Sequence, residues 1–239
     1  NTVFEIGSVT KTFTAVLLAE MVGRGEVALE DPVAKYLPAD VTVPSRNGRQ
    51  ITLLDLATQT SGLPRLPTNL APRDSGNPYA DYTEAQLFTF LNGYQLPRDP
   101  GSQYEYSNLG VGLLGLALAR RAGMSYEALL TERVLRPLGM RDTRVTLTDD
   151  MRRRLATGHA DGQAVENWDM AVLGGAGALR STANDLLKYV AAYLADDGPL
   201  HEALRMARTA QRPIPGGQIG LAWHILEHGP VKIVWHNGG

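Results

Sequence analysis

The feature that most constrains this fold is a helix near the start of the chain that is apolar on nearly every side. Apolar side chains recur there at helical spacing, at Phe13, Val16, Leu17, Leu18 and Met21. A helix with apolar residues all round is buried in a protein interior and does not lie on its surface. We therefore expect the other elements of the fold to pack around this helix.

Ser8 and Lys11 stand at the beginning of this helix, and their spacing places both side chains on one face, one turn apart. Burial disfavours a charged ammonium group, and a neutral lysine amine can accept the proton of a serine hydroxyl. The N–H groups of the helix N-terminus lie close to where an oxyanion would form. The pair predicts a serine nucleophile with its own base. The alternative is a capping serine followed by a solvated lysine, because this spacing also arises by chance.

Composition excludes several other classes of function. The chain has 239 residues, of which 44% are hydrophobic, enough for one large core or two lobes that share a cleft. Its net charge of −2 gives no reason to expect a nucleic acid partner. The absence of cysteine excludes disulfides, thiolate metal sites and cysteine catalysis. The histidines lack the spacing of metal ligands, so we expect neither a metal nor a cofactor.

Helical patterns dominate the chain, and only its last part changes to the alternation of β-strands. Three helices begin with a capping pair, Thr52 with Asp55, Thr83 with Gln86, and Thr182 with Asp185. Two runs alternate like antiparallel strands, Ile219 to Leu226 and Val231 to His236, with a turn at residues 228–230. Residues 64–82 are rich in proline and predict a long loop, and such loops usually border a functional site. These patterns predict a protein in which helices dominate and the strands are too few to complete a sheet.

Two further short motifs follow Ser8-x-x-Lys11 in the chain, Tyr106-Ser107-Asn108 and His236-Asn237-Gly238. In this order the three motifs resemble those of the serine β-lactamases and penicillin-binding proteins. The closest resemblance is to the branch that holds class C β-lactamases, D,D-carboxypeptidases and related esterases. Four more segments resemble landmarks of that family in family order: Gly7 to Lys11, Thr60 to Pro64, Arg136 to Met140 and Ser181 to Leu186.

The resemblance implies a catalytic role for three residues. Ser8 would attack an acyl carbonyl and form an acyl-enzyme, with Lys11 as its base. Tyr106 would relay protons between Ser8 and the leaving group, as a phenol whose ionisation is favoured by two neighbouring cations.

The resemblance also implies the residues that hold the substrate. Asn108 would hydrogen-bond both Lys11 and the amide of the substrate, and His236 and Gly238 would line the binding site. The backbone N–H groups of Ser8 and Gly239 would form the oxyanion hole.

The sequence departs from the family pattern at several positions, of which His236 bears on the substrate. His236 stands where β-lactamases of this branch usually carry lysine, and histidine is mostly neutral at pH 7. A weaker anchor for a substrate carboxylate favours a peptidase, an aminopeptidase or an esterase. Gln59 stands where many relatives have histidine, and we expect this change to affect only local packing.

The resemblance implies a single domain over residues 1–239, of the α/β (α+β) class, with a β-lactamase/transpeptidase-like fold that combines a helical lobe with an antiparallel sheet. We expect a helical lobe, about 60–175, inserted in a sheet-containing lobe formed by about 1–59 and 176–239. The chain begins at Asn1 and ends directly after a strand-like run, which indicates a fragment truncated at both ends.

The implied activity is a serine hydrolase that acts on β-lactams, D-Ala-type peptides or esters, in the periplasm of a bacterium or as a secreted protein. A carboxylesterase of the same fold and a penicillin-binding relative that never turns over are the alternatives. The sequence leaves the oligomeric state open.

Overall fold

The structure is a computed structural model that describes all 239 residues. The α-helices are α1 Thr10–Gly23, α2 Leu53–Ala57, α3 Glu84–Gly93, α4 Asn108–Ala122, α5 Tyr126–Leu130, α6 Asp149–Arg154, α7 Ala183–Leu194 and α8 His201–Ala207. Three 3₁₀ turns are η1 Gly7–Val9, η2 Val33–Tyr36 and η4 Ala171–Ala176, and a π-helical turn is η3 Thr131–Leu135. The strands are β1 Val3–Glu5, β2 Ser45–Arg46, β3 Arg49–Gln50, β4 Gly158–Ala160, β5 Gln163–Val165, β6 Arg180–Thr182, β7 Arg212–Ile214, β8 Gly217–Ile219, β9 His224–His228 and β10 Val231–Trp235.

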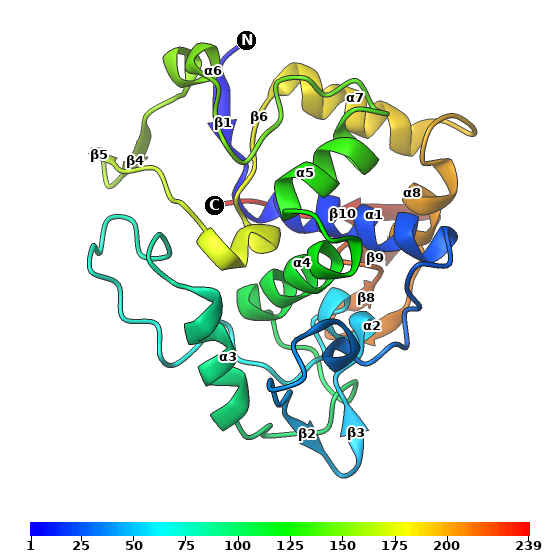
Figure 1. Cartoon of the computed structure of the whole chain (residues 1–239). Helices are drawn as coiled ribbons and strands as arrows, with labels where there is room; N and C mark the ends of the chain where they lie inside the picture. The colour runs from blue at the N-terminus through cyan, green and yellow to red at the C-terminus, as the bar shows by residue number, and fades with distance from the viewer.

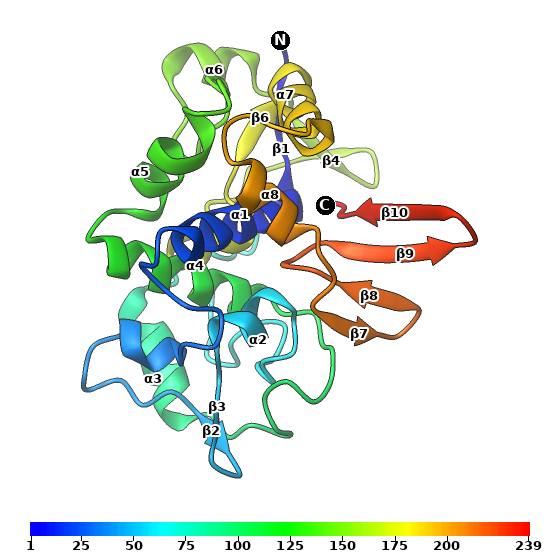
Figure 2. The same cartoon turned by 90° about the vertical axis from the view of Figure 1, so that its right-hand side faces the viewer.

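The apolar helix is the centre of the molecule, as the sequence predicts. Every residue of α1 from Thr10 to Met21 is buried. Helices α4, α5 and α8 and the turn η4 all contact α1. In Figure 2, α1 runs between the helices α4 and α5 on one side and α8 with the strands β7 to β10 on the other. Helix α1 is thereby packed between these two groups of elements.

The largest sheet has four antiparallel strands in the order β10-β9-β8-β7. Strand β10 lies at the edge of this sheet, and its register pairs Ile233 with Leu226 on β9. The remaining strands form three two-stranded pairs, β1 with β6, β2 with β3, and β4 with β5. Helices therefore combine with antiparallel sheets, the fold class that the sequence predicts.

The three capping pairs that the sequence predicts are present. The hydroxyl of Thr52 accepts from the Asp55 backbone N–H at the start of α2, and the Asp55 carboxylate accepts from the Thr52 N–H in return. Thr83 and Gln86 form the same reciprocal box at α3. At α7 the Thr182 hydroxyl accepts from the Asp185 N–H. Each pair satisfies N–H groups that the first helical turn leaves unpaired.

One predicted strand is wrong. The run Ile219 to Leu226 is not continuous, because a turn separates the end of β8 from the beginning of β9. In this turn the Leu221 N–H donates to the Ala207 carbonyl and the Ala222 N–H donates to the Ala57 carbonyl. A Cβ on Gly220 would lie 2.4 Å from the Ala207 carbonyl oxygen, so glycine permits this close approach. Bonds to the ends of two helices thus replace the sheet ladder.

Pairing of β1 with β6 brings the first residues of the chain beside the segment before α7, around the start of α1. Glu5 lies opposite Arg180, and the Ile6 N–H donates to the Leu179 carbonyl, which places Gly7 beside Gly177. Figure 1 shows the C-terminus close to this pair and to the beginning of α1. Segments from residues 1–10, 176–182 and 236–239 therefore meet at one point.

The proposed division into lobes at about residues 59/60 and 175/176 stays a prediction. No helix of the structure has both the length and the hydrophobicity needed to cross a lipid bilayer.

Candidate active site

Lys11 and Ser8 are in direct contact at the beginning of α1. Lys11 is completely buried, and its Nζ donates to Ser8 Oγ at 2.9 Å and to the Ala176 carbonyl at 2.7 Å. Ser8 itself lies in the short turn η1, directly before α1. Burial, and to a smaller extent the nearby Arg65 cation, lower the pKa of Lys11 to about 7. A substantial fraction of this lysine is therefore a neutral amine near pH 7, able to accept a proton.

The carbonyl of Ala176 is aimed at Lys11 by the turn η4, which packs against both α1 and α4. The Thr14 hydroxyl, one turn further along α1 than Lys11, donates to the Gly175 carbonyl at 2.8 Å. Two neighbouring carbonyls of η4 thus accept bonds from the same face of α1. This pair of bonds fixes the position of the lysine amine relative to Ser8.

Tyr106 from the second motif lies beside the same two residues. Its hydroxyl shares a hydrogen bond with the Ser8 side chain, and Lys11 Nζ lies 4.9 Å from its ring centroid. The structure corrects one expectation here, because the pKa of Tyr106 is raised, not lowered. Burial of the phenol outweighs both the Ser8 hydrogen bond and the Arg65 charge, which act in the opposite direction. Tyr106 is thus a protonated hydroxyl near neutral pH and is suited to donate a proton.

Asn108 does not bond Lys11, contrary to expectation. It is the first residue of α4, its backbone N–H donates to the Arg65 carbonyl at 3.0 Å, and its side-chain Oδ1 is buried without a hydrogen-bond partner. Lys11 donates instead to Ser8 Oγ and to the Ala176 carbonyl of η4. A buried acceptor without a partner is costly unless another molecule supplies the donor.

The third motif packs against the first. A Cβ on Gly238 would lie 2.1 Å from the Ile6 carbonyl oxygen and 3.3 Å from the Ser8 backbone nitrogen. A Cβ on Gly7 would in turn lie 2.8 Å from the Gly239 carbonyl oxygen. Only glycine permits this close approach of the two segments. The backbone N–H groups of Ser8 and Gly239 therefore lie on adjacent segments, as the oxyanion hole implied by the family resemblance requires.

His236 is the first residue of the third motif, and its ring centroid lies 6.3 Å from that of Tyr106. Its Nδ1 contacts the Asn237 carbonyl at 2.7 Å, and its Nε2 is buried without a partner. Burial lowers the pKa of His236 to about 4, and the Lys11 and His224 charges act in the same direction. His236 is therefore neutral at pH 7 and supplies no cation.

A sequence model of the family described as Beta-lactamase matches residues 1–239, the whole chain. The chain belongs to the Beta-lactamase family. The D-alanyl-D-alanine-carboxypeptidase/endopeptidase AmpH of Escherichia coli K12 is 38% identical over 256 residues, which cover all of this chain and 65% of AmpH. A beta-lactamase of the same strain is 32% identical, with 95% of this chain and 58% of the relative covered. The chain thus spans less than two thirds of the length of each of these relatives.

Solved structures agree with this assignment to the Beta-lactamase family. A beta-lactamase/D-alanine carboxypeptidase from Yersinia pestis, complexed with citrate, matches with a TM-score of 0.87 at 29% identity, over 100% of this chain and 71% of that one. A class C beta lactamase matches with a TM-score of 0.81, over 96% of this chain and 61% of that one. The fold is the β-lactamase/transpeptidase-like fold that the motifs predict.

Gln59 has a larger part in this Beta-lactamase-family site than the sequence indicated. Its side-chain Oε1 accepts from the Ser107 N–H at 2.7 Å, and its backbone carbonyl accepts from the Glu105 N–H at 2.8 Å. Tyr106 lies between these two bonds, so Gln59 fixes the backbone that carries it. The signal in the sequence was its position directly before the Thr60 to Pro64 landmark.

Arg65 is a second residue that the sequence analysis missed. Its guanidinium carbon lies 5.1 Å from the centroid of the Tyr106 ring, and the side chain is exposed. It follows the landmark Thr60 to Pro64 directly, but no motif of the family drew attention to it.

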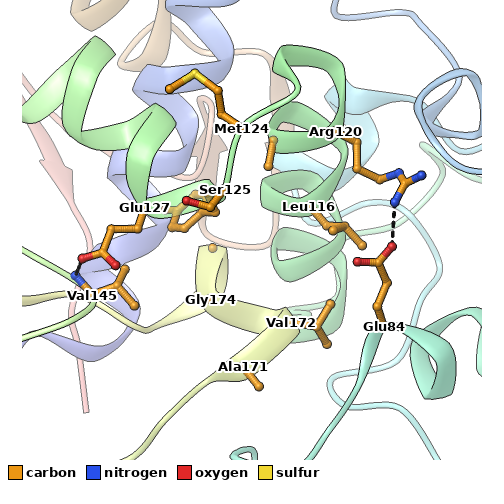
Figure 3. Close-up of a pocket in the computed structure, with 13 residues that line it drawn as sticks. Glu84, Leu116, Arg120, Met124, Ser125, Glu127, Val145, Ala171, Val172 and Gly174 are labelled. Atoms are coloured by element: carbon orange, nitrogen blue, oxygen red, sulfur yellow. Dashed lines mark hydrogen bonds and ion pairs between the residues drawn. The ribbon is translucent and has the colours of Figure 1, made fainter.

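A cavity of about 350 Å³ opens next to the motifs and is lined by Gly7, Gly177 and Gly239, with Ser75 and Gly76 among its other residues. The proline-rich loop 64–82 therefore reaches the site, as its length predicts. A separate cavity of about 480 Å³ lies between α4, α5 and η4. Figure 3 shows its rim, where Arg120 pairs with Glu84 and Glu127 accepts from Val145. None of the motif residues lines it.

Proposed function

We propose that this chain carries the catalytic centre of a serine hydrolase that acts through an acyl-enzyme on D-Ala-type peptides or β-lactams. The observation that carries the proposal is the 2.9 Å contact between Ser8 Oγ and a completely buried Lys11 amine whose pKa is about 7. A structural lysine gains nothing from such burial, whereas a catalytic base requires a pKa near the working pH.

In the proposed acylation the neutral Lys11 amine takes the proton of Ser8 Oγ while that oxygen attacks the carbonyl carbon of the substrate. The N–H groups of Ser8 and Gly239 stabilise the negative oxygen of the tetrahedral intermediate. The Tyr106 hydroxyl then gives its proton to the departing nitrogen or oxygen and regains one from the Lys11 ammonium. A water molecule then attacks the carbonyl carbon of the acyl-enzyme, the proton transfers run in the reverse order, and Ser8 is released.

Peptides with a D-alanine terminus are the favoured substrates. AmpH, at 38% identity, is named a D-alanyl-D-alanine carboxypeptidase/endopeptidase, whereas the beta-lactamase relative is 32% identical. A carboxylesterase with the same Ser8, Lys11 and Tyr106, and a penicillin-binding relative that does not turn over, remain the competing functions. The bacterial periplasm or the exterior is the proposed location, by analogy with the family.

Labelling with a fluorescent penicillin and with a fluorophosphonate tests the nucleophile. We expect Ser8→Ala to abolish labelling and Ser45→Ala, an exposed serine on β2, to leave it unchanged. Undiminished labelling of Ser8→Ala would reject the assignment.

Turnover of nitrocefin, a D-Ala-D-Ala peptide and p-nitrophenyl butyrate by the complete protein then separates the three functions. The D-Ala-D-Ala peptide is expected to be the best substrate. Labelling without turnover of any of the three would indicate the penicillin-binding relative.

A further inference from the structure

Arg65 is held at the point where the first and second motifs meet. Its backbone carbonyl accepts from the Asn108 N–H at 3.0 Å and from the Leu109 N–H at 3.2 Å. The residue is therefore tied to the first turn of α4, directly after Tyr106. This fixed backbone places the guanidinium 5.1 Å from the centroid of the Tyr106 ring, a cation–π distance. Lys11 Nζ lies 4.9 Å from the same centroid.

No carboxylate of the chain neutralises this arginine. The side chain of Arg65 is exposed, and its guanidinium forms no ion pair and no hydrogen bond with another group of the protein. Other arginines of the chain have such partners: Arg98 pairs with Glu105, and Arg212 with Asp55. A guanidinium keeps its charge throughout the physiological pH range. Arg65 is thus a permanent cation, beside the nucleophile, with its hydrogen-bond donors unused.

The electrostatic surroundings of Ser8 are positive. The Arg65 charge acts to lower the pKa of Lys11, Tyr106 and Tyr79, although burial raises the pKa of both tyrosines overall. The field of Arg65 therefore reaches each of these side chains. No carboxylate acts on the pKa of Lys11, Tyr106 or His236. His236, which stands where a lysine is usual, is neutral. The fixed positive charge of the site is therefore on the Arg65 side of Tyr106 and not at the third motif.

We propose that Arg65 binds a carboxylate of the substrate and that Arg65, not His236, selects anionic substrates. The planar guanidinium presents paired N–H donors that match a carboxylate in a bidentate arrangement. The carboxylate has two sources in a D-Ala peptide, the C-terminal residue that leaves and an acidic side chain on the acyl part. This inference rests on the proposed function, because it concerns the substrate of the same centre.

Two matched pairs of substrates distinguish these sources. The first pair is an acetyl-D-Ala-D-lactate depsipeptide and its methyl ester, which differ in the carboxylate of the leaving group. The second pair is p-nitrophenyl hemisuccinate and p-nitrophenyl butyrate, which differ in a carboxylate on the acyl group. The ratio of kcat/KM within each pair isolates the carboxylate, since any effect of Arg65 on the Lys11 pKa changes both members alike.

We expect Arg65→Gln to lower the carboxylate-to-neutral ratio in one of the two pairs by roughly 5- to 30-fold, mainly through KM. Arg65→Lys should retain part of the preference, because it keeps the charge but loses the bidentate geometry. Arg49→Gln is the matched control, since Arg49 is also exposed and lies on strand β3 of the β2–β3 hairpin, away from the motifs.

Equal losses on both members of both pairs would show that Arg65 only positions Tyr106 and Lys11, and would overturn the proposal. Unchanged ratios would do the same. Calorimetric titration of Ser8→Ala protein with the depsipeptide and its methyl ester separates this inference from the proposed function. One outcome is that the wild-type protein hydrolyses none of these substrates while Arg65→Gln, added to the Ser8→Ala protein, abolishes the preference for the carboxylate in binding. In that case the hydrolase function fails and the anchoring role stands.

Discussion

At the scale of single residues, the chemistry of the site depends on how far burial moves two titrating side chains. Lys11 and His236 are both cations at low pH and both are desolvated, so the pKa of each is lowered. The result differs because the two start from different values. The pKa of Lys11 falls to about 7, so this amine can exchange protons near neutral pH. The pKa of His236 falls to about 4, so this imidazole is neutral at pH 7.

The Lys11 pKa predicts the pH dependence of acylation. The amine is the active form, so the acylation rate with a neutral ester is expected to rise as pH increases through about 7 and to level off above it. Stopped-flow acylation between pH 5 and 9 measures this profile, with Lys11→Arg as the control that cannot lose its charge. We expect that variant to be slower by about 10² to 10⁴-fold at every pH. A wild-type rate that stays level between pH 6 and 8 would contradict the role of Lys11 as base.

A second prediction at this scale concerns His236. Because its pKa is about 4, the wild-type preference for a carboxylate-bearing over a neutral substrate should not change between pH 6 and 8, and should increase only in more acidic solution. His236→Lys introduces a second cation and is expected to raise that preference several-fold at neutral pH, an effect of about 1 kcal/mol. Values of kcat/KM for both substrates at two pH values measure it. If the variant slows both substrates equally, His236 serves proton relay only.

At the scale of secondary-structure elements, the sequence predicted the helices better than the strands. Capping pairs and helical spacing are local signals, so α2, α3 and α7 begin where Thr52, Thr83 and Thr182 predict. Strand β6, of three residues, forms by pairing with β1, which is about three quarters of the chain away. No local pattern contains that information.

The same limit applies to the site. The motifs predicted Ser8, Lys11 and Tyr106 as neighbours, since their spacing and order carry the resemblance. The bonds from Gln59 to either side of Tyr106, and the unpaired charge of Arg65, depend on which loop happens to face the second motif. The sign of the Tyr106 pKa shift was wrong for a similar reason, because the extent of burial is a property of the assembled site.

The contact between the first and third motifs predicts a contrast between two neighbouring glycines. Gly238→Ala places a Cβ 2.1 Å from the Ile6 carbonyl and must displace the segment, whereas a Cβ on Gly239 meets nothing within 4 Å. We expect Gly238→Ala to reduce acylation by roughly 10²-fold, as small displacements of catalytic groups do. Gly239→Ala keeps its N–H and should change the rate only a few-fold. Equal rates for the two variants would place the third motif away from the nucleophile.

Helix α2 predicts a measurable loss of stability. Asp55 is buried, completes the capping box with Thr52 and pairs with Arg212 of β7 at 2.7 Å. Asp55→Ala removes the cap and leaves Arg212 without its carboxylate, which is expected to cost about 3 kcal/mol in the free energy of unfolding. Gln86→Ala removes the same half of the box on α3, without an ion pair, and should cost about 1 kcal/mol. Urea unfolding measures both values, and equal losses would show that the Arg212 pair contributes nothing.

At the scale of the whole molecule, apolar side chains gather on two exposed faces. On β10 the alternate residues Val231, Ile233 and Trp235 are 54%, 46% and 38% exposed, and alternation places them on one face of the sheet. On α7 Leu187 and Leu194 are 66% and 76% exposed, and their spacing places them on one side of the helix. Figure 2 shows β10 at the edge of its sheet, where no further strand pairs with it.

An unpaired edge strand with an apolar face promotes association. We therefore expect the 239-residue chain to associate as its concentration increases, with the β10 face involved. Val231→Lys puts a charge on that face and should reduce the mass measured by light scattering across a range of concentrations. Val165→Lys is the matched control, because Val165 is 45% exposed on the separate β4–β5 hairpin. If both variants associate like the wild type, β10 is not the contact, whereas a monomeric wild type at every concentration would show that the exposed face is tolerated in water.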